Sequence, residues 1–81
     1  MRITVTQIDI DHGVMKSAMG CPVARAIQRQ TGDCGATTGR TTVVTGARIY
    51  YLPQIATKFV EAFDNGLTLK PIEFDLLESQ A

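Results

Sequence analysis

Cysteines and long apolar runs are both scarce in this chain, and their scarcity excludes several classes of protein. Only two cysteines, Cys21 and Cys34, occur among the 81 residues, too few for the disulfide framework of a small secreted domain. No apolar run approaches the roughly 18 residues that a membrane span needs. The opening MRITVTQIDID alternates and carries acids, unlike a signal peptide. We therefore expect one small cytoplasmic domain over residues 1–81.

Net charge is also lacking, because eight basic and eight acidic side chains balance at pH 7. A neutral chain has no overall attraction to nucleic acid or to anionic membranes. The two signs are nevertheless unevenly spread. Six basic and three acidic residues occur up to residue 48, and two basic and five acidic residues follow. This asymmetry favours a polarised surface that suits protein association, although small proteins also show such imbalance by chance.

Signatures of catalysis and of cofactor binding are missing as well. The glycine-rich stretch TGDCGATTGR departs from the phosphate-loop pattern, because Arg40 stands where a lysine is needed and the spacing fails. It is either a long connection built on glycine turns or a loop that grips an anion through Arg40. Structural zinc requires closely spaced ligand pairs, whereas the two cysteines are 13 positions apart and His12 is the only histidine. We expect no catalytic residue, no metal and no cofactor, and hence a protein that is not an enzyme.

The N-terminal segment predicts a strand followed by a short helix. RITVT alternates apolar and polar residues, as a half-buried strand does. Thr6 and Asp9 then have the spacing of a capping box, in which each side chain satisfies a backbone amide of the other residue. The helix is expected to run through His12 and to stop at Gly13 in the left-handed conformation.

Two longer helices are predicted from their end signals and apolar spacing. Cys21 occupies the N-cap position of the first, Pro22 its first helical position, and Gly32 ends it. The second begins at Pro53 within LPQIATKFVEAFDNG and ends at Asn65–Gly66. Its expected inward face consists of Ile55, Ala56, Phe59, Val60 and Phe63.

The remaining segments predict strands. Threonine, valine and tyrosine crowd into GATTGRTTVVTGARIYYL, which is typical of two strands joined by a turn near Thr45 and Gly46. PIEFDLL alternates apolar and acidic residues and predicts a last strand that starts near a sheet edge, because Pro71 cannot donate to a ladder.

This order, β-α-β-β-α-β, is the split βαβ pattern with ferredoxin-like order. It predicts a single α+β domain with a four-stranded, mostly antiparallel sheet and both helices on one face. The other face of the sheet would be open or paired with another subunit. A small α+β sheet with a different strand order is the alternative.

Cys21 is the one cysteine with a candidate role. A disulfide to Cys34 is disfavoured, because the intervening helix is about 13 Å long and bridged cysteines need Cα atoms within about 7 Å. At a helix N-terminus the dipole favours the thiolate, which makes Cys21 a candidate reactive thiol. No base is placed beside it by the sequence, so the competing interpretation is a small buried N-cap residue.

Five further residues are candidate binding residues. Arg25 and Arg29 stand one turn apart on the expected outward face of a helix, where they contact a partner or simply face solvent. In RIYYL, Arg48 and Tyr50 share one face of a strand, and Arg40 lies on the neighbouring strand. Such a group can hold single-stranded nucleic acid by stacking and charge. The RNA-binding consensus is absent and the net charge is zero, which disfavours that interpretation.

Four segments together, ITVTQ-DI-HG, CPVARAI, LPQIATKFVEAFDNG and P-EF-L, resemble a group of small uncharacterised phage-encoded proteins. The resemblance covers most of the chain, and its motifs are structural rather than catalytic. Relatives of this kind often carry a second cysteine shortly before the C-P pair, whereas residues 16–20 here contain none. The resemblance implies a small accessory or regulatory factor in the host cytoplasm.

The sequence therefore predicts a small non-enzymatic interaction protein. It would form a homodimer or bind a host or phage protein, docking through one sheet face or through the region of Arg25, Arg29 and Arg40. The alternative is a single-stranded nucleic-acid binding module that uses Arg40, Arg48 and Tyr50 on the sheet face.

Overall fold

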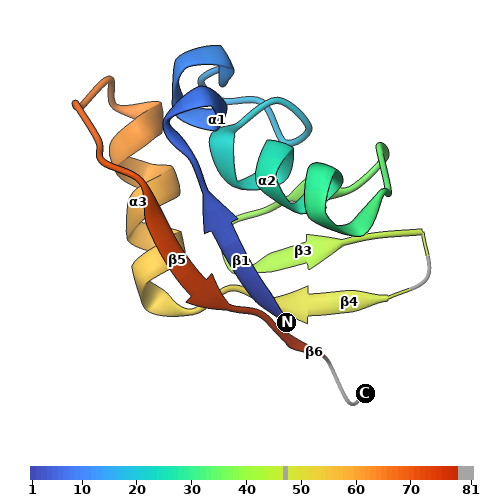
Figure 1. Cartoon of the computed structure of the whole chain (residues 1–81). Coiled ribbons are helices and arrows are strands. Elements are labelled where there is room, and N and C mark those ends of the chain that lie inside the picture. Colours follow the sequence, from blue (N-terminus) through green and yellow to red (C-terminus); the bar gives the residue numbers. More distant parts are fainter. Residues whose placement is uncertain (47, 79–81) are drawn as a thin grey trace.

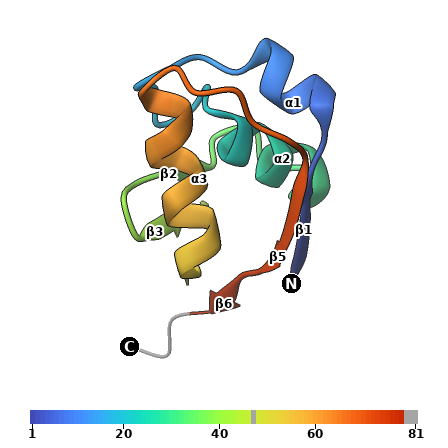
Figure 2. The same ribbon diagram turned by 90° about the vertical axis from the view of Figure 1, so that its left-hand side faces the viewer.

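The computed structural model describes residues 1–46 and 48–78. Along the chain lie β1 (Arg2–Val5), α1 (Gln7–His12), α2 (Pro22–Thr31), β2 (Thr37–Thr38), β3 (Thr42–Val44), β4 (Ile49–Tyr51), α3 (Gln54–Asp64), β5 (Ile72–Asp75) and β6 (Leu77–Glu78). The predicted α+β class is confirmed. Helix α2 is central and packs against β1, α1 and α3 (Figures 1 and 2). Within the described ranges, no helix has the length and apolar character needed to cross a membrane.

The strands pair antiparallel in two sheets, β1–β5 and β2–β3–β4–β6. The expected single sheet with ferredoxin-like order is therefore not confirmed. The last extended run changes partner, because β5 pairs with β1 whereas β6 pairs with β4. At the join, the Leu76 amide donates to the Met1 carbonyl at 2.8 Å and the Leu76 side chain is buried. Alternation predicts an extended chain but not the strands with which it pairs.

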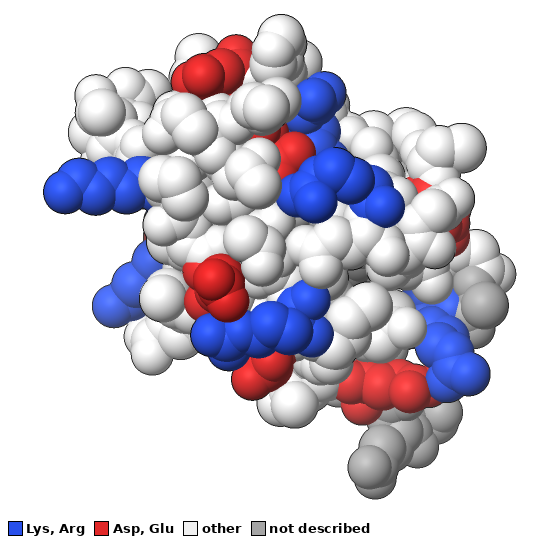
Figure 3. Space-filling model, viewed as in Figure 1, with Lys and Arg blue, Asp and Glu red and all other residues white. Residues whose placement is uncertain are grey.

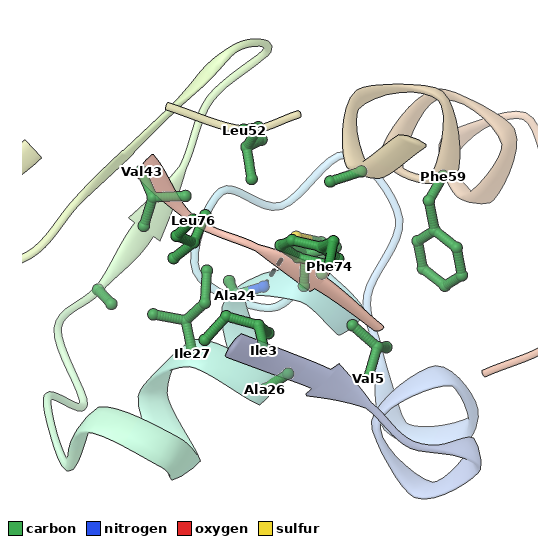
Figure 4. Close-up of a cluster of buried hydrophobic side chains, with 14 residues drawn as sticks. Ile3, Val5, Ala24, Ala26, Ile27, Val43, Leu52, Phe59, Phe74 and Leu76 are labelled. Carbon is green, nitrogen blue, oxygen red and sulfur yellow. Dashed lines mark hydrogen bonds between the residues drawn. The ribbon is translucent and has the colours of Figure 1, made fainter. Parts of the chain in front are cut away.

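One apolar core lies between the two sheets and the longer helices (Figure 4). Strands β1, β3 and β5 and helices α2 and α3 contribute to it, as do Cys21, Ala36, Leu52 and Leu76, which lie between elements. Its larger members are Ile3, Val5, Val23, Ile27, Val43, Leu52, Phe59, Phe74 and Leu76. Because each buried aliphatic or aromatic side chain stabilises the fold by about 1.5–3 kcal/mol, this cluster is the main source of stability in so short a chain.

Apolar spacing predicted the buried face of α3 almost fully. Ala56, Phe59 and Phe63 are buried and Val60 packs against the core. Ile55 is the exception, since its side chain is exposed. It lies about 100° round the helix from Ala56, at the margin of the face that the core covers.

The first helix begins and ends where predicted, but the conformation at its C-terminal end differs from the prediction. Thr6 and Asp9 form both hydrogen bonds of the capping box, at 3.3 Å and 3.0 Å. The expected left-handed Gly13 is wrong, because its φ is −68°. Glycine is needed there for space instead. A Cβ atom would lie 2.7 Å from Pro22 Cγ and 2.9 Å from Phe63 Cζ.

The open edge of β1 is covered by a side chain of α2. Gln30 donates from Nε2 to the Arg2 carbonyl at 2.9 Å and accepts at Oε1 from the Thr4 amide at 2.7 Å. This amide pairs with the edge as a neighbouring strand would. It blocks the unpaired donors and acceptors that make a sheet edge prone to unwanted pairing.

Candidate functional site

Four apolar residues lie on the side of β3, β4 and β6 that faces away from the core, together with Thr42, which lies opposite Tyr51. Val44 lies opposite Ile49, and Tyr51 lies opposite Leu77. Directly opposed residues point to the same side of a sheet and their side chains touch. The four residues are 45%, 48%, 49% and 65% exposed, respectively. We call this group, Val44, Ile49, Tyr51 and Leu77, the outer sheet face.

Basic and acidic side chains of the two sheets form ion pairs. Arg48, which precedes β4, forms an ion pair with Glu78 of β6. Arg2 likewise pairs with Glu73 at 3.3 Å and Asp75 at 3.4 Å. Basic residues from the first part of the chain thus pair with acidic residues from the last part. This pairing reduces the separation of positive and negative charge that the sequence predicted. Among the described residues on the side shown in Figure 3, basic and acidic groups are interspersed and form no continuous basic band.

The predicted Arg25 and Arg29 pair is divided between two environments. Arg29 donates to the Asp9 carboxylate at 2.9 Å and to the Thr4 carbonyl at 3.0 Å, so it holds α1 and β1 against α2. Arg25 is half-buried, and its Nε has no hydrogen-bond partner among the described residues. The structure therefore gives Arg29 a structural contact that an outward helical position did not predict.

The residues of the predicted nucleic-acid platform do not gather into one exposed group. Tyr50 pairs in register with buried Val43 and packs against the core, so its ring is only partly accessible. Tyr51 is the exposed tyrosine of β4. Arg48 is engaged with Glu78. Arg40 does not lie on the neighbouring strand, as predicted, but in the loop between β2 and β3, where it lines a pocket with residues of α3.

Cys21 is a buried N-cap residue. Its sulfur accepts a hydrogen bond from the Ala24 amide at 3.4 Å, Pro22 follows at the first helical position, and only 2% of Cys21 is exposed. Burial raises the pKa of the Cys21 thiol, and the lowering by the Ala24 amide does not offset it. Both conditions oppose the thiolate that a reactive cysteine needs. Cys34 is exposed, and both cysteines are free.

A polar pocket of about 480 Å³ opens beside Cys21. Its walls are the loop before α2, the segment between β2 and β3, and one face of α3. Charged side chains in the lining are Lys16, Arg40, Glu61 and Asp64. The sequence singled out Cys21 and Arg40 of this lining but did not predict the pocket, because its walls come from three distant segments whose meeting depends on the tertiary fold.

Two further observations concern metal binding and similarity to known proteins. Among residues 1–46 and 48–78, no three His, Cys, Asp or Glu side chains are grouped as metal ligands would be. Comparison with protein-family models, curated proteins and solved structures finds no match. The geometry of the outer sheet face and of the pocket therefore carries the functional conclusions.

Proposed function

We propose that this chain is a non-enzymatic interaction protein that works as a homodimer, with the outer sheet face of one copy against that of another. The observation that carries the proposal is the ladder of four half-exposed apolar side chains, paired across β3, β4 and β6. Scattered apolar residues on a surface are ordinary, whereas a contiguous group surrounded by polar residues marks an interaction site.

A second copy fits this face for two reasons. A two-fold contact sets the same patch against itself, so the patch must tolerate its own charges. The four residues of this face are uncharged, and Arg48 and Glu78 pair with each other on the other side of the sheet, so face-to-face docking brings no unpaired like charges together. Dimerisation also adds buried apolar area to a domain that is too small to bury much by itself.

The single-stranded nucleic-acid alternative has less support. It needs exposed cations beside exposed rings, because phosphate neutralisation supplies most of the affinity of such proteins. Arg48 is already paired and Tyr50 is half-buried. From the resemblance to phage proteins, we further propose that the dimer binds a host or phage protein.

Sedimentation velocity over a range of concentrations tests the dimer. We expect the wild-type protein to dimerise, and Tyr51→Glu to be monomeric because a charge would be buried in the apolar contact. Thr68→Glu is the matched control, since Thr68 is exposed in the loop between α3 and β5 and the change in charge is the same. A wild-type monomer, or dimers that survive Tyr51→Glu unchanged, would overturn the proposal. Strong salt-dependent binding to a single-stranded oligonucleotide would favour the alternative.

A further inference from the structure

The charges of the pocket beside Cys21 are segregated by wall. Glu61 and Asp64 are three residues apart in α3 and therefore lie on one face of that helix. Lys16 and Arg40 come from the two loops that form the other walls. Within the described residues, none of the four side chains forms an ion pair with another. The pocket thus presents two carboxylates on one wall and two cations on the others.

The cationic side of the pocket is held in place by the anionic side. The Lys16 amide donates to Asp64 Oδ1 at 2.8 Å. Lys16 has a φ of 58°, which a residue with a side chain rarely adopts. This contact ties the loop before α2 to the end of α3 and so joins two walls of the pocket.

Thr38 belongs to the lining of the pocket, but its hydroxyl oxygen is enclosed by protein. Thr38 lines the pocket and is 6% exposed, and its hydroxyl oxygen has no hydrogen-bond partner among the described residues. Thr38 faces the Cys21 thiol and lowers its pKa, although burial outweighs this effect. Because the hydroxyl oxygen is not accessible from the pocket, recognition of a ligand depends on the charged walls.

We propose that this pocket binds a small zwitterion of the α-amino-acid type, free or at the end of a peptide. The ligand carboxylate lies toward Lys16 and Arg40, and its ammonium lies toward Glu61 and Asp64. Ala18 and Val60 supply aliphatic surface within a lining that also includes Ser17, Thr57 and Asn65, and this surface suits a small aliphatic side chain. The volume lies within the range of about 300–1,000 Å³ typical of small-molecule sites. A simple anion leaves the carboxylate wall unmatched, and a simple cation leaves the two basic groups unmatched.

This proposal goes beyond the homodimer, because none of the pocket residues belongs to the outer sheet face. The test is a ligand titration of the full chain, in which two-dimensional NMR monitors the backbone amide resonances. L-valine is the probe, with 3-methylbutanoate lacking its ammonium group and 2-methylpropylammonium lacking its carboxylate. We expect L-valine to give saturable shifts around Lys16, Thr38 and Arg40. Each one-charge analogue should bind roughly tenfold or more weakly, the loss that corresponds to one good charged contact.

Variants distinguish binding in the pocket from non-specific binding elsewhere on the surface. Arg40→Gln should weaken L-valine binding about tenfold and leave 2-methylpropylammonium binding unchanged. Glu61→Gln should weaken L-valine binding by a similar factor and leave 3-methylbutanoate binding unchanged. Arg48→Gln, outside the pocket, is the matched control and should bind L-valine as the wild-type protein does. Shifts that fail to saturate, equal binding of L-valine and 3-methylbutanoate, or indifference to Arg40→Gln would each overturn the proposal. Tyr51→Glu should bind L-valine normally, so failure of the dimer leaves this test intact.

Discussion

Arg29 Nη2 lies 2.9 Å from Oδ2 of the buried Asp9 carboxylate, and this pair joins the first turn of α1 to the last turn of α2. The same carboxylate oxygen accepts hydrogen bonds from the Thr6 amide at 3.0 Å and the Thr6 hydroxyl at 3.1 Å. Asp9 therefore caps α1 and also binds Arg29 of α2. This small network orients the N-terminal strand and helix on the core.

The network makes stability depend on pH. Burial disfavours the charged form of Asp9, but the hydrogen bonds from Thr6 and Arg29 outweigh it and hold the pKa of Asp9 below its ordinary value. A lowered pKa in the folded state gives stability that is present above about pH 4 and is lost as pH falls through the folded pKa. Urea unfolding across that range should show the loss. Asp9→Asn should be less stable at neutral pH and should lose less on acidification.

The control for this comparison is internal. Hydrogen bonds from the Gly46 and Gly35 amides also lower the pKa of Asp33, so the wild-type protein and Asp9→Asn share that part of the acid response. Arg29→Gln should lower neutral-pH stability in the same direction as Asp9→Asn. Parallel stability curves for the wild-type protein and Asp9→Asn would contradict the assigned role of the carboxylate.

Gln30→Ala should weaken the protection of the β1 edge. Two hydrogen bonds to backbone groups are lost, each worth about 0.5–1.5 kcal/mol, and the lower end applies because the edge is exposed. Thermal unfolding should report the loss, and hydrogen exchange at the Thr4 amide should accelerate. Gln54→Ala is the control, because Gln54 is exposed at the start of α3. If Thr4 exchanged at the same rate in both variants, the side chain would not be pairing with the edge.

Gly13→Ala should destabilise the fold through crowding, not through backbone conformation. The added methyl would lie within 2.9 Å of atoms of both Pro22 and Phe63, so packed groups must shift at a cost of about 1–3 kcal/mol. Gly35→Ala is the matched control, since its Cβ would meet only Asp33 Oδ1 at an ordinary 3.5 Å. Equal unfolding free energies for the two variants would show that residues 13, 22 and 63 are not in close contact.

The two cysteines should differ sharply in reactivity. Alkylation followed by mass spectrometry at neutral pH should modify exposed Cys34 quickly and buried Cys21 slowly, because burial raises the pKa of the Cys21 thiol. Cys34→Ser should remove the fast step. Fast modification of Cys21 in the folded Cys34→Ser variant would contradict this prediction and show that Cys21 is a reactive thiol.

Local signals in the sequence predicted local structure well. Thr6, Asp9, Cys21, Pro22 and Gly32 act within a few residues of themselves, so the helix ends they specify could be predicted without knowledge of the fold. Apolar spacing predicted the inward face of α3 for the same reason.

Features that depend on distant contacts were not predicted. Leu76 looks like any inward residue of an alternating strand, yet the chain changes sheets there because Met1 and β4 happen to lie on either side of it. Arg29 sits where a solvent-facing arginine would, and only the tertiary fold brings Asp9 within its reach. The pocket combines three separate segments, so no single motif marks it.

The central claim is that two copies meet through the outer sheet face, and an isotope-filtered NMR experiment on mixed labelled and unlabelled protein tests it most directly. Only contacts between different copies give signals in such a sample. The account predicts cross-peaks between the Tyr51 ring of one copy and methyl groups of Val44, Ile49 or Leu77 of another. Cross-peaks that arise only from other surfaces, or none in a sample of monomer mass, would contradict it.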